Sequence, residues 1–74
     1  MHLMGRLVNH FFVRCEIGAE VKYAVRSETG GILLRDTEYY IDDDRYAAHA
    51  LRDEVVILHP EAKVIVDCRQ GWSD

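Results

Sequence analysis

The sequence predicts a small α+β domain in which one amphipathic helix packs on one face of an antiparallel sheet of about four strands. Two observations carry this prediction. Apolar and polar side chains alternate in the first half of the chain and again near its end, and a stripe of apolar residues at helical spacing lies between these regions. The expected order is strand, strand, strand, helix, strand. A chain of 74 residues has room for one domain, which we expect to span residues 1–74.

An alternating pattern predicts the first two strands. From Leu7 to Ile17 the odd positions are mostly apolar, as in a half-buried strand. Gly18 and Ala19 follow as a plausible tight turn, and residues 20–26 alternate again. Two strands joined this closely should form a hairpin.

A third strand is predicted at Ile32–Ile41, after the turn residues Ser27–Gly31. Paired glycines supply the positive φ that a chain reversal needs. The apolar positions change phase within this strand, and a bulge near Arg35 and Asp36 would reconcile its two halves.

The helix is expected to begin after three aspartates, because carboxylates there cap free backbone N–H groups and favour the positive end of the helix dipole. Its core-facing stripe covers about 100° of a helical wheel. The stripe consists of Ala47, Ala48, Leu51, Val55 and Leu58. His59 and Pro60 end the helix, since the residue before proline is pushed out of the α region.

The region after the helix start allows two interpretations. Val55–Leu58 also has high β-propensity and could form a hairpin with the strand that follows, so a shorter helix stays open as an alternative. The final strand is predicted at Lys63–Cys68, and residues 69–74 are expected to be a short frayed end.

Composition favours a folded chain without strong affinity for nucleic acid. Hydrophobic residues make up 49% and charged residues 30%, and the net charge is −4. Residues 1–35 carry five Lys or Arg against three Asp or Glu, whereas residues 36–74 carry four against ten. This polarity argues weakly against general nucleic-acid binding. No apolar stretch is long enough for a signal peptide or membrane span, so we expect a cytoplasmic protein.

No motif for catalysis, metal binding or a cofactor is found, and we expect a non-enzymatic protein that uses neither. Cys15 and Cys68 lie on the predicted core faces of their strands, where inert thiols are the usual outcome and a disulfide is the alternative. His49 and Asp53 stand one helical turn apart and could share a metal or a proton, yet this spacing also arises on any solvated helix face.

The leading candidate for a binding surface is acidic. Five carboxylates crowd into nine residues, which predicts a docking segment for a partner protein with a basic surface. These are Asp36, Glu38, Asp42, Asp43 and Asp44. The plainer interpretation is a solvated approach to a capped helix.

A second apolar strip on the predicted helix favours self-association. Tyr46, Ala50 and Ile57 form this strip, and Val56 interrupts the polar side. A helix that is apolar on nearly every flank usually contacts more than its own sheet. We therefore expect a homodimer, with these four residues at the contact.

An alternative function is a small nucleic-acid-binding module. The outward face of the first hairpin is predicted to set one aromatic ring among cations, as in sheet-based RNA binders. The residues of this face are His10, Phe12, Arg14, Lys22 and Arg26. A solvated sheet face with one exposed Phe is the plainer interpretation.

The size of the chain and the order of its elements from Leu7 to Cys68 resemble small accessory proteins of phages and other mobile elements, including anti-CRISPR proteins. The resemblance rests on architecture and carries over no functional residue. It implies an inhibitor or adaptor that occupies a surface of a larger machine, and the expected function is accordingly that of a non-enzymatic interaction protein.

Overall fold

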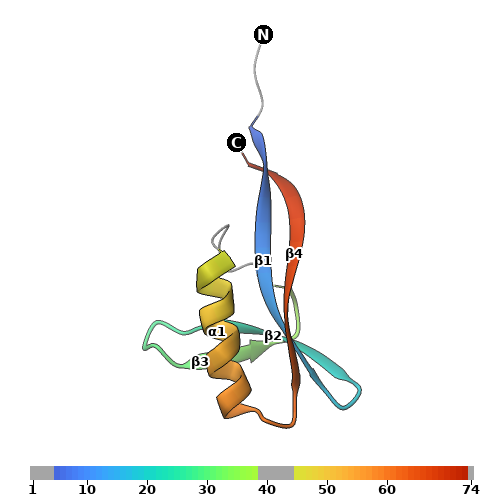
Figure 1. Ribbon diagram of the computed structural model, residues 1–74, viewed down its shortest axis with the longest axis vertical. Helices are drawn as coiled ribbons and strands as arrows, with labels where there is room; N and C mark the ends of the chain where they lie inside the picture. Colours follow the sequence, from blue (N-terminus) through green and yellow to red (C-terminus); the bar gives the residue numbers. More distant parts are fainter. Residues whose placement is uncertain (1–4, 39–44, 74) are drawn as a thin grey trace.

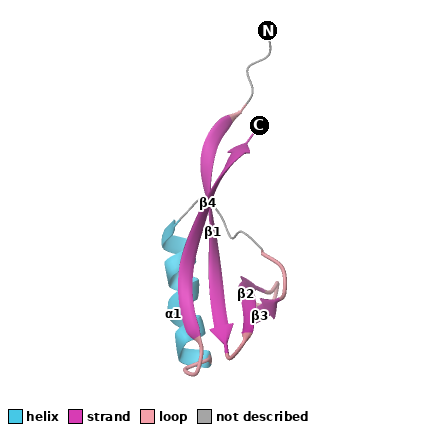
Figure 2. Ribbon diagram, turned by 90° about the vertical axis from the view of Figure 1, so that its right-hand side faces the viewer, coloured by secondary structure: helices cyan, strands magenta, loops and turns pink. Residues whose placement is uncertain are grey.

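The computed structural model describes residues 5–38 and 45–73, and within them the chain forms four strands and one helix (Figure 1). The elements are β1 (Arg6–Ile17), β2 (Glu20–Arg26), β3 (Ile32–Arg35), α1 (Arg45–Leu58) and β4 (Lys63–Ser73). The strands pair antiparallel in the order β3-β2-β1-β4. Figure 2 shows α1 against one face of this sheet. The predicted α+β class and the order of elements are confirmed.

The hairpin of β1 and β2 closes with a two-residue loop. Gly18 has a φ of 60°, whereas Ala19, like every other described residue that is not glycine, has a negative φ. This φ pattern is that of a type II′ turn, which matches the twist of the strands that it joins. The loop pairs Ile17 with Glu20 and so sets the register of the whole hairpin.

The strands β1 and β4 form a long ribbon. They pair at eleven successive positions, from Arg6 opposite Ser73 to Glu16 opposite Lys63. In contrast, β2 pairs with β1 at only four positions, next to the hairpin loop. The part of the ribbon nearest the two chain ends extends as two strands past the N-terminal end of α1 (Figure 1).

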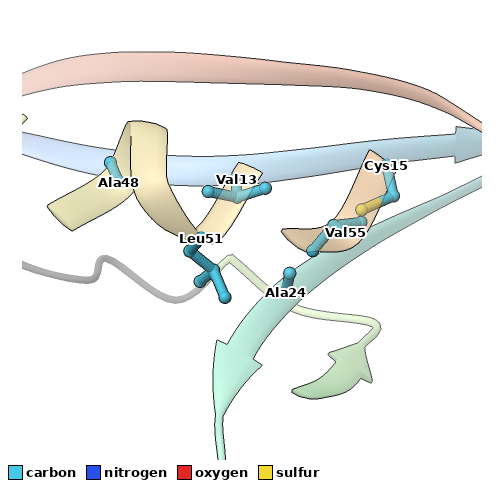
Figure 3. Packing of buried hydrophobic residues seen from close by; sticks show 6 residues of the cluster. All are labelled: Val13, Cys15, Ala24, Ala48, Leu51 and Val55. Atoms are coloured by element: carbon cyan, nitrogen blue, oxygen red, sulfur yellow. The ribbon is translucent and has the colours of Figure 1, made fainter. Parts of the chain in front are cut away.

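The core lies between α1 and the odd-numbered side chains of β1. Six residues are buried in this cluster, and Figure 3 shows how they meet. They are Val13, Cys15, Ala24, Ala48, Leu51 and Val55. Two of the six are alanines, which let the helix approach the sheet closely. The largest fully buried side chains are only Val13, Val55 and Cys15, so the core is thin.

Two predicted boundaries are wrong, and one alternative is decided. β3 ends at Arg35, and residues 36–38 are not in a strand, because the phase of the apolar positions is lost there. β4 continues to Ser73 instead of fraying after Cys68, because β1 is long enough to pair with it throughout. Residues 55–58 belong to α1. Residues 39–44, with the predicted helix cap, lie outside the described residues.

The core stripe of the helix is narrower than predicted. Ala48, Leu51 and Val55 are buried, but Ala47 is exposed and Leu58 keeps 59% of its surface exposed. The helix packs on β4, β1 and β2, and only one row of its side chains, Ala48, Leu51 and Val55, is buried in this contact.

Candidate functional site

The described part of the acidic segment is balanced by basic side chains of the same chain. Asp36 is 81% exposed and forms an ion pair with Lys22, and this hydrogen-bonded contact raises the pKa of the lysine. Glu38 forms an ion pair with Arg69 of β4. Asp42, Asp43 and Asp44 lie outside the described residues. Each of the two described carboxylates is thus paired with one cation of the same chain, and the two ion pairs add no net charge to the surface.

An ion pair between β2 and α1 orients the helix. Arg26 binds Glu54 through two hydrogen bonds, the longer of which joins Nη1 to Oε1 at 3.3 Å. The pair raises the pKa of the arginine and lowers the pKa of the glutamate, mainly through the hydrogen bond in both cases. The Glu54 side of α1 therefore faces β2.

The apolar strip of α1 divides into two parts. Tyr46 and Ile57 are 72% and 79% exposed, and with Ala50 they lie on the side of the helix away from the sheet. Val56 is 44% exposed and lies about 160° around the helix from Glu54. Glu54 faces β2, so Val56 lies on the other flank of the helix. That flank is toward β4, which is on the far side of β1 from β2.

The predicted cationic face of the hairpin is divided between two faces of the sheet. Arg14 is directly opposite Tyr23, and residues that are directly opposite share a face. His10, Phe12 and Arg14 therefore lie on the face away from α1. The core residue Ala24 is on the α1 face, and alternation places Lys22 and Arg26 there with it. The expectation that all five residues share one surface is wrong.

Phe12 is also buried, although the sequence pattern predicts an exposed position for it. Its exposed fraction is 7%. Its ring meets Tyr23 edge to face with 6.3 Å between centroids, and the guanidinium of Arg69 lies 6.0 Å above it. Tyr23 of β2 and Arg69 of β4 thus cover Phe12 in a small second cluster on the sheet face opposite α1. Alternation along β1 alone does not reveal that this position is covered.

The two cysteines are free and far apart. Cys15 is opposite Val64 whereas Cys68 is opposite Phe11, so four positions of the ribbon separate them, or about 13 Å at the usual rise. This separation excludes the disulfide, which needs Cα atoms within about 7 Å. Cys15 is buried, and burial raises the pKa of its thiol, whereas Cys68 is exposed.

The described residues show no built site for a metal or a small molecule. His49 and Asp53 are both exposed on α1, and Asp53 forms an ion pair with Arg52 at 3.2 Å. No three metal-ligating side chains converge within residues 5–38 and 45–73. A hollow of about 280 Å³ lies at the β2–β3 turn beside Leu33 and is open to solvent. No helix in these segments is long and apolar enough to cross a membrane.

The exposed end of the β1–β4 ribbon is not among the surfaces expected from the sequence. Leu7 and Trp72 are directly opposite each other on the α1 face, and they are 49% and 71% exposed. Trp72 keeps the parity of Val64, Val66 and Cys68, but the polar Gln70 interrupts the alternation before it, so the sequence gives only a weak signal for the longer strand. β4 pairs with β1 along one edge. Its other edge, called the outer edge here, is the end of the sheet formed by the described residues.

Comparison of the chain with models of protein families, with curated proteins and with solved structures finds no match. The surfaces of the fold are therefore the basis for a functional proposal.

Proposed function

We propose that this chain is a non-enzymatic interaction protein that binds another protein with a basic surface and also self-associates. The observation that supports the proposal is the outward strip of α1, where Tyr46 and Ile57 keep about three quarters of their surface exposed. Scattered exposed apolar residues are ordinary, but a strip along one helix face marks an interaction site.

Charges around the strip indicate the chemistry of the partner. Asp53 borders the strip on the helical wheel, about 20° from Tyr46 on the side away from Ile57, and three further aspartates precede α1 in the sequence. An apolar centre with a charged rim is the common anatomy of a protein interface. A partner with apolar and basic side chains complements this surface, as an inhibitor or adaptor of a larger assembly would require.

Site-specific photo-crosslinking in the native host tests the proposal. A benzoylphenylalanine replaces Ile57 in one variant and Ala19 in the control, because Ala19 is an exposed residue of the β1–β2 loop, which lies away from α1 (Figure 1). We expect an adduct with one protein from position 57 and not from position 19, and we expect the purified pair to dissociate as salt rises. The same adducts from both positions, or none from position 57, would contradict partner binding by the strip.

A further inference from the structure

The outer edge of β4 is a long strand edge without a partner in the described part of the chain. β4 has eleven residues and is the last strand of the sheet on its side. Such an edge presents backbone N–H and C=O groups that can pair with another strand. Its residues contain no proline, which would block pairing.

The parity of the sheet identifies the outward backbone groups. In a hairpin with a two-residue loop, the flanking residues Ile17 and Glu20 exchange hydrogen bonds. The backbone N–H and C=O groups of the odd residues of β1 then point toward β2, and those of its even residues point toward β4. In β4, the backbone groups of the odd residues pair with β1, and those of the even residues point outward from the sheet edge. The N–H of Cys68 agrees with this assignment, because it donates to the side-chain Oδ1 of its neighbour Asp67 at 2.9 Å.

We propose that β4 pairs antiparallel with β4 of a second copy of this chain, about a two-fold axis at Cys68. This proposal deepens the self-association of the proposed function and rests on it. The two sheets become one continuous sheet with both helices on the same face. The carbonyl of Cys68 in the second copy replaces Asp67 as the acceptor for the outward N–H of Cys68.

Charge complementarity selects this register. With Cys68 at the axis, all eleven residues of β4 pair, and Asp67 is opposite Arg69 of the second copy on both sides of the axis. An axis at Asp67 or at Arg69 places like charges directly opposite, which destabilises a strand pair. An axis at Val66 places Lys63 opposite Arg69 of the second copy. An axis at Gln70 leaves Lys63–Val66 unpaired.

The same register covers exposed apolar surface. Trp72 becomes opposite Val64 of the second copy, and both side chains are on the α1 face. Val56 of that copy lies on the adjacent flank of its helix, toward β4. The 71% exposed indole and the 44% exposed Val56 thus become neighbours across the interface. Of the four residues expected at the homodimer contact, this pairing therefore involves Val56. Tyr46, Ala50 and Ile57 point away from the sheet and stay available to the partner protein.

A charge-swap experiment by sedimentation equilibrium tests the pairing. We expect the wild-type chain to form a species of twice its 8.6 kDa mass. Asp67→Arg and Arg69→Asp each place like charges opposite in the homodimer and should weaken association roughly tenfold or more. The double variant restores opposite charges across the interface and should associate more strongly than either single variant, although it places like charges beside Glu38 and Arg14 of its own chain.

Mixing the two single variants provides the control for folding. One chain then carries two cations and the other two anions at positions 67 and 69, so the mixed pair is complementary on both sides of the axis. We expect a heterodimer on mixing although neither variant associates alone. A misfolded variant would not recover in this way, and circular dichroism at low concentration checks each chain separately.

Two further readouts locate the axis. Copper-phenanthroline should oxidise the two Cys68 thiols of the dimer to one disulfide, with the two electrons passing to the oxidant, because the expected Cα separation of about 5.5 Å permits it. Cys68→Ser should abolish the crosslink. The emission of Trp72, the single tryptophan, should shift to the blue as the chain dimerises.

The outcomes separate the proposals. A wild-type chain that stays monomeric at high micromolar concentration overturns both self-association and the β4 pairing. A dimer that the single variants leave intact, or that mixing does not restore, overturns the β4 pairing alone. Neither result bears on partner binding by the α1 strip, which the photo-crosslinking experiment decides.

Discussion

At the residue scale, Phe12 combines an aromatic contact with almost complete burial, so its main contribution is to stability. We predict that Phe12→Ala lowers the free energy of unfolding by about 3–5 kcal/mol, because it removes a buried ring and leaves a cavity. Urea denaturation measures this change. Leu33→Ala is the matched control, since Leu33 is 49% exposed, and its cost should be about 1 kcal/mol or less. Equal costs for the two variants would contradict the burial of Phe12.

Cys15 should make stability depend on pH in the alkaline range. Burial raises the pKa of its thiol in the folded chain above the ordinary value of 9.0. The unfolded chain therefore ionises first, and the free energy of unfolding falls as the pH rises above 9, by at most about 1.4 kcal/mol per pH unit.

Denaturation of wild type and Cys15→Ala between pH 7 and pH 10 checks this prediction. The wild-type chain should lose more stability over the range than the variant does, after subtraction of their difference at pH 7. Parallel curves would show that the thiol does not titrate on unfolding. Cys68→Ala serves as the control, because that thiol is exposed.

At the scale of elements, the loop between β1 and β2 depends on Gly18. Its φ of 60° disfavours an L side chain, although a Cβ there would meet no atom within 4 Å. We predict that Gly18→Ala costs about 1–2 kcal/mol from backbone strain alone. Chemical synthesis with D-alanine at position 18 provides the sharpest comparison, because the D residue prefers positive φ. Thermal unfolding of both chains should rank D-alanine above L-alanine, and the reverse order would contradict a backbone origin.

Most elements of the fold follow from periodicity and turn residues, whereas the candidate surfaces depend on register. The two-residue loop pairs residues whose numbers sum to 37, as for Ile17 and Glu20, so even residues of β1 share a face with odd residues of β2. This pairing places the side chains of Arg14 and Lys22 on opposite faces of the sheet. It is implicit in the predicted turn, and it could have been applied to the cationic face from sequence alone.

Other features could not be read from local sequence. The burial of Phe12 depends on Tyr23 and Arg69, which belong to the strands on either side of it. The ion pairs of Asp36 and Glu38 join residues 14 and 31 positions apart, and no local pattern indicates such partners. Tertiary placement, and not propensity, decides these contacts.

At the scale of the whole molecule, charge is divided between a mildly positive first half and an acidic second half. The fold partly neutralises both halves by pairing cations of the first with carboxylates of the second. Lys22 of β2 binds Asp36, which follows β3, and Arg26 of β2 binds Glu54 of α1. What remains for a partner is the surface before and along α1. Long-range attraction from such a surface acts mainly on the association rate.

The acidic segment should therefore steer a basic partner, and we predict that Asp36→Asn with Glu38→Gln slows association roughly three- to tenfold at low salt. The change also releases Lys22 and Arg69 from their ion pairs, which adds repulsion toward a basic surface. Stopped-flow mixing with the partner found by photo-crosslinking measures the rate. Because salt screens such forces, the difference should shrink at 0.5 M salt, and the dissociation rate should change little.

Net charge alone could produce the same slowing, so a control variant must change the charge equally at another place. Glu28→Gln with Glu61→Gln also removes two negative charges, at exposed turn residues outside the acidic segment. If the segment docks the partner, the Asp36 and Glu38 variant should slow association several-fold more than this control. Equal slowing by both would mean that the overall charge steers the encounter, and unchanged rates would leave the segment as a solvated approach to α1.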